Sequence, residues 1–425
     1  MRTTTCLKNI SNMEMKELFG YLAPFFWLIP SPWFLIRKTH SRNRNKKYID
    51  SLRLKLNEKS QSYLEDFGIA QISHGLPYYE IIETHRDNSS FFLPIPIEKK
   101  ELLSKKKFTQ QKIKPELNCL SDSFLKINDF NKGFSFWGCK WDEASKQEIR
   151  ELSIKVADRI YNDITSGKRR FNGLMSGVFS FSETCGNDEN VIPDILLYKT
   201  DFFTFRVFAQ YYKDHYEKIK DAFSSNEITK IVNGLSMPFL SSLGVSIIAV
   251  ISTNSIKDSI TDDDLVVIGY RSDKVEGDNN SYHFTMNEAV IPADAMNNST
   301  TFSNSATRGF VEELRWASDS EISFSQFYFT DLYLETNKCE VGLTGFVKIE
   351  LTGQMSNDLD YAKKKLKGLY SNARDGSFET KEIVFIPVKE IRQFLSENKK
   401  TMSAGFAVAL NNFIDRYELG VLTKE

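Results

Sequence analysis

An uncharged run of 19 residues near the N-terminus, from Leu18 to Ile36, most limits how this chain can fold. A helix of that length spans nearly 30 Å at about 1.5 Å per residue, which matches the hydrocarbon core of a bilayer. Six lysines and arginines, and no acidic residue, follow between positions 37 and 47. A basic block directly after an apolar run is typical of the cytoplasmic side of a membrane. The sequence therefore predicts a membrane anchor in residues 1–40, with the rest of the chain in the cytoplasm.

Three prolines in this run leave other interpretations open. Pro24, Pro30 and Pro32 interrupt helical hydrogen bonding, although membrane helices tolerate proline better than soluble helices do. The run can also be a re-entrant or interfacial segment, or an element of a cytoplasmic protein that packs on the main body. No small-residue cleavage site follows it, which favours a retained segment over a removed signal peptide.

Composition excludes several classes of protein. A chain of 425 residues is long enough for two or three domains, and its net charge of −1 argues against a bulk nucleic-acid binder. The five cysteines are odd in number and scattered, without a CxxC pair, which indicates reduced thiols in the cytosol. The five histidines are not paired at zinc-ligand spacing, so histidine-based metal chemistry is not expected.

Residues 41–235 are expected to form an α+β accessory domain. A polar helical segment opens it at residues 40–60. Apolar residues recur at helical spacing in residues 141–164, where they predict an amphipathic helix, and strand-like segments follow at 177–183 and 194–212.

Residues 236–425 alternate apolar strand patterns with helical ones. The expected strands are 243–253, 262–272, 282–290, 325–334, 341–351 and 381–388. A polar loop is expected at 295–305, a helix over 306–316, and a last helix over 403–417. This order predicts an α+β fold in which helices sandwich a mixed sheet.

The helix over 306–316, ATRGFVEELRW, carries the candidate chemistry. Arg308 and Glu312 are four residues apart and share a face, and Glu313 follows directly. Phe310, Val311 and Leu314 are expected to point toward the sheet. Adjacent glutamates can hold Mg²⁺ when substrate phosphates complete its coordination. The alternative is an exposed helix with a surface Arg–Glu pair that contributes well under 1 kcal/mol.

Placed between strands, this helix resembles the box of the Nudix superfamily, G-x5-E-x7-R-E-U-x-E-E-x-G-U, in which U is a bulky apolar residue. Arg308, Phe310, Glu312, Glu313 and Trp316 match its later positions. The resemblance covers residues 236–425 and implies a Nudix-like α/β/α sandwich. It also implies that Glu312 and Glu313 bind Mg²⁺ and that Arg308 orients one of them, so that all three are catalytic.

Two flanking segments extend the resemblance. The strand end YRS, with Tyr270 and Arg271, is similar to a strand end that the family carries before its box. The late acidic residues Glu379 and Glu382 lie where the family sometimes places a base or a metal ligand.

The departures from the box are specific. Gly309 replaces the glutamate after the box arginine, and Arg315 replaces the box glycine. The family's first glutamate falls on Thr300 here, so that Glu288 or Asp294 takes its place only if the intervening loop is an insertion. The resemblance therefore implies a weak Mg²⁺ site and reduced or lost catalysis.

The architecture resembles membrane-anchored Nudix effectors of bacterial cyclic-oligonucleotide anti-phage signalling (CBASS). The resemblance implies a cyclic oligonucleotide or other nucleotide as ligand, a lipid membrane as partner, a single pass through the inner membrane and homo-oligomerisation. Expected ligand-binding residues are Tyr270, Arg271, Glu288 and Trp316. The alternatives are a Mg²⁺-dependent Nudix hydrolase of a nucleoside diphosphate derivative and an inactive Nudix domain that binds proteins.

Overall fold

The structure is a computed structural model that describes residues 32–79, 86–92, 140–165, 173–185, 191–219, 239–252, 259–273, 278–295, 301–373 and 379–422. The chain divides into two units, Met1–Leu52 and Arg53–Glu425, and the boundary falls within helix α2 (Pro32–Phe67). The expected anchor lies outside the described residues up to position 31. Among the helices that the structure describes, none combines the length and the apolar character needed to cross a membrane.

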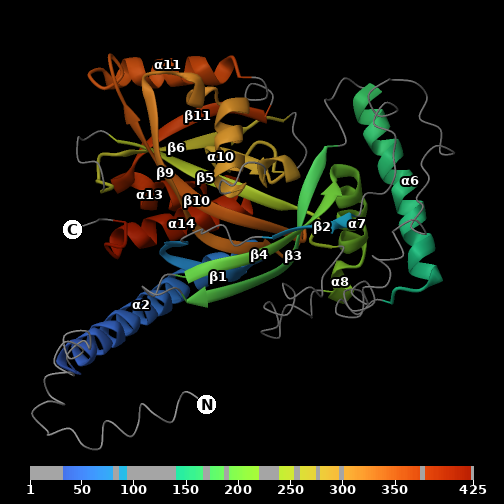
Figure 1. Cartoon of the computed structure of the whole chain (residues 1–425). Coiled ribbons are helices and arrows are strands. Elements are labelled where there is room, and N and C mark those ends of the chain that lie inside the picture. The colour runs from blue at the N-terminus through green and yellow to red at the C-terminus, as the bar shows by residue number, and fades with distance from the viewer. Residues whose placement is uncertain are drawn as a thin grey trace, which may run out of the picture. The chain divides into compact units, whose positions relative to one another are not determined.

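The second unit is built on an eight-stranded mixed sheet (Figure 1). Strands β10 and β5 are parallel, and the other pairs are antiparallel. This confirms the prediction of an α+β chain with a mixed sheet. The strands run in the order β1 (Ile69–Tyr79), β9 (Ile322–Glu335), β10 (Glu340–Leu351), β5 (Leu243–Ile251), β6 (Leu265–Arg271) and β11 (Thr380–Pro387), while β7 (Tyr282–His283) pairs with β6 and β8 (Met286–Ala289) pairs with β5.

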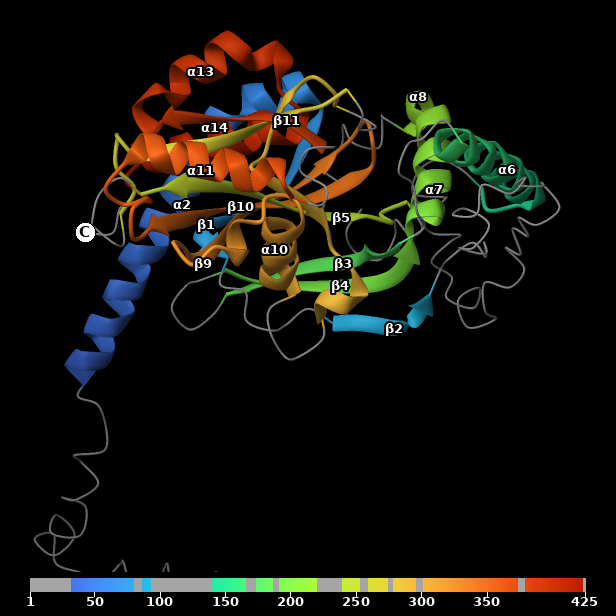
Figure 2. The same ribbon diagram turned by 90° about the horizontal axis from the view of Figure 1, so that it is seen from above.

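Helices cover both faces of this sheet (Figures 1 and 2). Side chains of β5 alternate between the faces, as the pleat of a strand requires. Val245 and Ile247 belong to the core under α10 (Thr301–Glu312) and α11 (Leu359–Ser371). Ile248 and Val250 belong to the core under α13 (Ile391–Asn398) and α14 (Ala404–Glu418). Because β5 is buried on both faces, its sequence is almost continuously apolar.

A three-stranded sheet with its own helices precedes β5 in the chain. Its strands β2 (Arg86–Phe92), β4 (Val191–Asp201) and β3 (Leu174–Cys185) lie in that order. Helix α6 (Glu143–Thr165), predicted over 141–164, is confirmed, and it packs against α7 (Phe202–Asp214), which α8 (Tyr216–Ile219) follows. Strand β1, from the range expected to be accessory, pairs with β9 of the main sheet.

The strand predicted over 194–212 is wrong beyond Asp201, where the chain turns into α7. The Asp201 carboxylate accepts a hydrogen bond from the N–H of Thr204 at 2.8 Å, which caps the helix. Phe203, Val207 and Tyr211 then recur every fourth residue on the buried face. The aromatic and β-branched residues that suggested a strand are therefore used to fill one side of a helix, which shows tertiary packing overriding local propensity.

Two shorter corrections concern α10. The helix begins at Thr301, so residues 301–305 are helical and do not belong to the polar loop expected there. Val311 is 41% exposed, whereas Phe310 and Leu314 are buried. Phe310 and Leu314 are four residues apart and share the core-facing side, and Val311 is turned about 100° away from Phe310.

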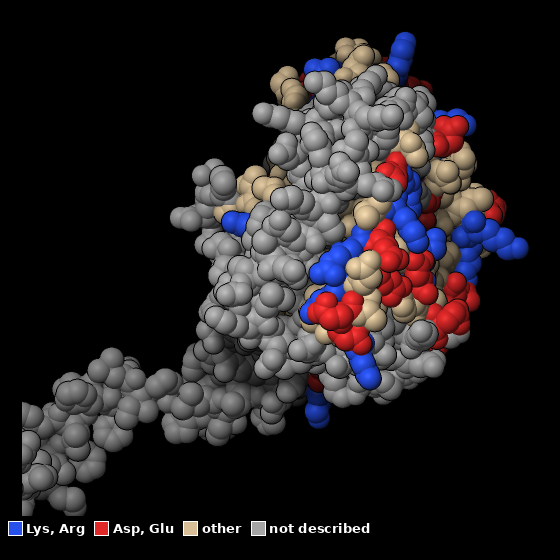
Figure 3. Space-filling model, turned by 90° about the vertical axis from the view of Figure 1, so that its right-hand side faces the viewer, with Lys and Arg blue, Asp and Glu red and all other residues tan. Residues whose placement is uncertain are grey.

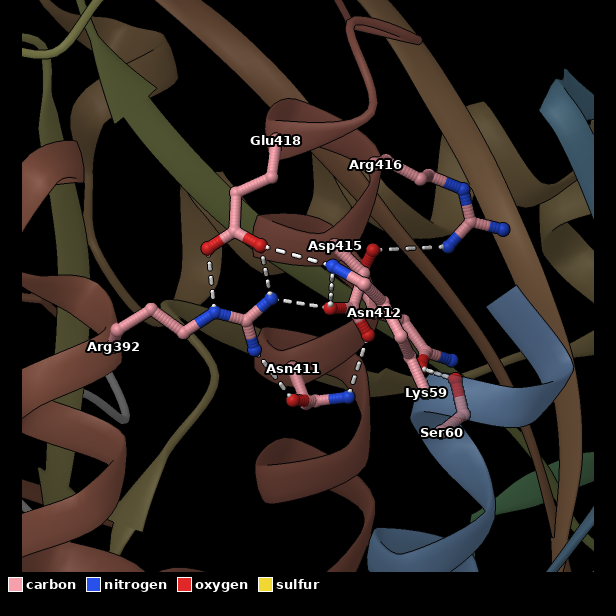
Figure 4. Close-up of polar contacts among 8 residues, drawn as sticks. All are labelled: Lys59, Ser60, Arg392, Asn411, Asn412, Asp415, Arg416 and Glu418. Atoms are coloured by element: carbon pink, nitrogen blue, oxygen red, sulfur yellow. Dashed lines mark hydrogen bonds and ion pairs between the residues drawn. The ribbon is translucent and has the colours of Figure 1, made fainter. Parts of the chain in front are cut away.

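The second half of α2 is fixed to α14 by polar contacts (Figure 4). Ser60 donates a hydrogen bond to the Asn412 side chain at 2.6 Å, and the Lys59 ammonium lies 3.1 Å from Glu418. Arg392 of α13 donates to the same glutamate at 2.7 Å. These contacts join three helices on one face of the sheet.

Figure 3 faces the side on which Figure 1 labels α6. On the described part of this surface, Lys and Arg side chains are interspersed with Asp and Glu side chains. Mixed charges of this kind produce weaker long-range fields than a patch of one sign.

Candidate functional site

The candidate site lies where strand β5 changes its partner. The first half of β5 pairs with β8, and its last residues, 249–251, pair with β6. Thr285 lies in the gap between these strands, and its hydroxyl accepts a hydrogen bond from the N–H of Ala249 and donates one to the carbonyl of Val267. Because the strands separate here, side chains from β6, β7 and β8 can reach the same space.

Arg308 of α10 is held by groups from the segment before the helix. Its guanidinium makes two bonds of 3.0 Å to the Asp294 carboxylate, which lies in the short 3₁₀ helix η5 (Pro292–Ala295). It also donates to the carbonyl of Ala289 at 2.7 Å and lies 2.8 Å from Glu288. Bidentate pairs of this kind fix orientation as well as charge. The surface pair with Glu312 considered from the sequence is replaced by these contacts.

Three further carboxylates lie within electrostatic reach of Glu288: Glu312 at the end of α10, Glu313 directly after it, and Glu379. Burial is the main cause that raises the pKa of Glu288 to about 7; Arg308 opposes the rise, and the charges of Glu379 and Glu312 contribute to it. Burial also raises the pKa of Glu313 well above its usual range, and Glu379 and Glu288 act in the same direction. The Arg271 guanidinium and the N–H of Asn287 oppose that rise. Burial and the neighbouring carboxylates therefore favour the protonated forms of Glu288 and Glu313.

Gly309 brings α10 into close contact with β8. A Cβ atom at this position would lie 2.4 Å from the sulfur of Met286 and 3.3 Å from the Cβ of Glu288. Met286 is itself fully buried, so the space cannot be opened by a simple rotation into solvent. The glutamate of the Nudix box therefore has no room in this packing.

A cavity of about 660 Å³ adjoins the carboxylate cluster and shares Glu288 with it. Positive side chains from several elements line it: Arg159 of α6, Arg206 and Lys213 of α7, Arg271 of β6, and Lys338 between β9 and β10. Four acidic side chains also line it: Asp278, Glu288, Glu335 and Glu340. Lys338 bridges two of these, at 2.7 Å from Asp278 and 2.8 Å from Glu335. The cavity is polar and carries both signs of charge.

The residues expected from the sequence are only partly brought together. Arg271 and Glu288 line the cavity, and Glu313 lies within electrostatic reach of both. Tyr270 lies at a centroid distance of 5.0 Å from Tyr282, which packs with the core on the other face of the sheet. Trp316 is fully buried, and its indole N–H donates to the carbonyl of Leu366 at 3.2 Å. A side chain in that position contacts the core and does not reach the cavity.

Sequence reasoning missed the cations that α6 and α7 contribute. Arg206 and Lys213 lie seven residues apart, so they share one side of α7. In a helix this spacing places both cations on one side, so it could have indicated a shared site. The segment was predicted as a strand, in which residues seven positions apart lie on opposite faces. Lys338 follows β9 in a short turn, and no pattern in the sequence distinguishes it from an ordinary surface lysine.

The carboxylates do not form a protein-only metal site. Glu312 and Glu313 offer the hard oxygen ligands that Mg²⁺ prefers. Over the described ranges, however, no group of three or more His, Cys, Asp or Glu side chains is arranged to hold a metal ion.

Replacing Glu340 by Gln is expected to stabilise the protein by about 1 to 2 kcal/mol at pH 8 and to have little effect at pH 5. Burial raises the pKa of Glu340 from 4.5 to about 7, and Glu335 adds to the rise. Between pH 4.5 and about 7, the Glu340 carboxyl keeps its proton in the folded protein but has released it in the unfolded chain. Raising the pH therefore favours unfolding, and glutamine removes that penalty. Urea unfolding at both pH values measures the difference.

The Glu321→Gln variant is the matched control. Hydrogen bonds from Lys365 and from the N–H of Gln354 lower the pKa of Glu321. The charged form is therefore favoured in the folded state, and the substitution is expected to lower stability at pH 8. A Glu340→Gln variant with the same stability difference at both pH values would contradict the assignment.

Arg315→Gly is expected to raise the free energy of unfolding by about 1 kcal/mol. Arg315 lies between α10 and the short 3₁₀ helix η6 (Trp316–Ser318), with φ of 59°, in the left-handed region that disfavours side chains. It is exposed and makes one long hydrogen bond, 3.3 Å, to the carbonyl of Asn372. The same change at Arg150, inside α6, is expected to lower stability by a similar amount because glycine weakens a helix interior. Thermal unfolding of both variants measures whether each substitution raises or lowers stability.

Comparison with known proteins adds little to this geometry. No family model matches the sequence, and no curated protein matches it. Solved structures do match, among them "Crystal structure of Tm1382, a putative Nudix hydrolase", at 14% identity and a TM-score of 0.23. The match covers 40% of this chain and 70% of that chain. Similarity at this level carries no information on substrate or activity.

Proposed function

We propose that the chain binds a nucleotide in the cavity beside α10 and acts as a sensor of that ligand. The observation that carries the proposal is the cavity itself. Its volume of about 660 Å³ lies within the range of small-molecule sites. Cations from α6, α7 and β6 line it, and guanidinium and ammonium groups are the usual partners of phosphate oxygens.

The packing of α10 against β8 favours ligand binding without turnover. Glu312 ends the helix and Glu313 follows it directly, but the packing of Gly309 against Met286 excludes a third glutamate. A Mg²⁺-dependent hydrolase of a nucleoside diphosphate derivative is the alternative function.

The membrane part of the proposal comes from the sequence. We infer that residues 18–36 attach the chain to the inner membrane, because the segment is uncharged and a basic block follows it. In that arrangement ligand binding in the cytoplasm would act on the membrane through oligomers of the chain. Sedimentation of the full chain with vesicles, compared with a variant that lacks residues 1–40, tests the attachment.

The central experiment measures binding and turnover in one series. Purified full-length protein in detergent is titrated with cyclic dinucleotides and with nucleoside diphosphate derivatives, with and without Mg²⁺, by calorimetry. The same mixtures are then separated by chromatography to detect products. The proposal expects dissociation constants in the micromolar range or below and no product.

Two variants sharpen the result. Arg206→Gln removes a cation from the cavity and is expected to weaken binding about tenfold, a typical effect for a charged hydrogen bond. Lys389→Gln is the matched control, because Lys389 is exposed and pairs with Asp263, away from the cavity lining. If the protein turns over a nucleotide and Glu313→Gln abolishes that turnover, the hydrolase function is correct and the sensor function is wrong. An absence of binding for every nucleotide would overturn the proposal.

A further inference from the structure

Helix α14 begins at the cavity. Ser403, its N-cap residue, and Gly405 both belong to the lining, and the N–H of Ser403 donates to the carbonyl of Tyr282 at 3.0 Å. A helix of 15 residues carries partial positive charge at its N-terminus, where the first N–H groups have no partner within the helix. This end of α14 is therefore suited to a negatively charged group.

One such group already occupies the position. The N–H of Gly405 donates to the Glu335 carboxylate at 3.2 Å, and the ammonium of Lys338 lies 2.8 Å from the other oxygen of that carboxylate. A Cβ atom on Gly405 would lie 2.2 Å from the Tyr333 hydroxyl, so only glycine permits this approach of the backbone. The structure thus shows an anion bound at the helix N-terminus, supplied by the chain itself.

The hydroxyl of Ser403 points to a second occupant. An N-cap serine normally accepts a hydrogen bond from the second or third N–H of its helix. Ser403 makes no such bond, although it is only 3% exposed, and its Oγ has no partner among the described residues. The Nε of Arg271, another lining residue, is also buried without a partner in the described structure. Unpaired buried donors are unfavourable, and a ligand oxygen would satisfy them.

We propose that the N-terminus of α14 is an oxyanion subsite of the cavity, which receives a phosphate group of the ligand. The Ser403 hydroxyl and the first N–H groups of α14 donate to the phosphate. The phosphate replaces the Glu335 carboxylate, and Lys338 then pairs with the ligand. This subsite rests on the proposed nucleotide function, because it lies in the same cavity, and it adds a second place for negative charge besides the cations of α6 and α7.

The test uses inorganic pyrophosphate, inorganic phosphate and the nucleotides above as probes on the full chain. Ser403→Ala is expected to weaken pyrophosphate binding about tenfold, because it removes a donor. Glu335→Gln is expected to tighten binding severalfold, because the competing anion becomes neutral. The control, Ser396→Ala, removes a hydroxyl on α13 that bonds to the carbonyl of Gln393, and it should leave binding unchanged.

The two substitutions are expected to change affinity in opposite directions, which distinguishes a phosphate subsite from a general loss of structure. Ser403→Ala breaks no hydrogen bond within the described structure, so its melting temperature should equal that of the unmodified protein. Nucleotide binding that neither Ser403→Ala nor Glu335→Gln alters would overturn the subsite and leave the proposed function standing. Weaker binding by Glu335→Gln would overturn it as well. If no probe binds, both proposals fail.

Discussion

Replacing Arg416 by Met is expected to lower the free energy of unfolding by about 3 to 5 kcal/mol. Arg416 of α14 is fully buried, and it pairs with both oxygens of Asp331 on β9, at 2.8 Å and 2.9 Å. It also donates to the carbonyl of Thr330 at 3.0 Å. Without the guanidinium, the buried Asp331 carboxylate loses the positive charge that Arg416 supplies, and this accounts for most of the loss in stability. Urea unfolding followed by circular dichroism measures it.

A double variant isolates the cause. Arg416→Met combined with Asp331→Leu removes both charges, and exchanging a buried ion pair for apolar groups of similar volume is often close to neutral. The double variant should therefore recover most of the stability. Lys389→Met, at an exposed pair with Asp263, should cost less than about 1 kcal/mol. A single Arg416→Met variant that loses no more than this control would contradict the prediction.

Replacing Gly309 by Glu, the residue that the Nudix box has at the corresponding position, is expected to destabilise the protein by about 3 kcal/mol and to confer no turnover. The new side chain would have to displace Met286, which is fully buried, and would place another carboxyl beside Glu288. Both overpacking and charge burial act against folding. Thermal unfolding measures the loss, and chromatography of nucleotide mixtures with Mg²⁺ tests for turnover.

Gly368→Glu is the matched control. Gly368 lies inside α11, and a Cβ atom there would meet nothing within 4 Å. The same substitution should therefore stabilise the protein, by up to about 1 kcal/mol, because glutamate favours a helix over glycine. Adding Met286→Ala to Gly309→Glu should recover part of the loss by making room. A Gly309→Glu variant as stable as the unmodified protein would contradict the prediction, because Met286 and β8 would then move at little cost in free energy.

The main sheet was largely predictable because its strands are marked by strong local patterns. Strands β5, β6, β9, β10 and β11 lie where apolar runs were found, and the last helix matches α14 within one residue at each end. Helices α11 and α13 were not predicted. Both are short, and their apolar residues, such as Leu366 and Leu395, are separated by charged stretches that resemble loops.

The candidate site was predicted less completely, because it depends on contacts between distant segments. The sequence placed Arg308, Glu312 and Glu313 on one helix, and it raised Glu288 and Asp294 as substitutes for the missing glutamate. The structure brings both of these to Arg308. It also places Arg206 of α7 and Ser403 of α14 in one cavity with Glu288, and these residues lie up to about two hundred positions apart in the chain.

The sequence by itself determined where apolar, strand-forming runs and amphipathic helices follow one another along the chain. It also determined the positions of the charged residues on α10. These properties follow from the periodicity of burial along a single element. Only the tertiary structure decided which charges meet, because pairing across the sheet and between helices depends on register and on close packing. Gly309 shows the difference. In the sequence it stands where the Nudix box has a glutamate, and in the fold it lets α10 lie against Met286 and leaves no space for a glutamate side chain.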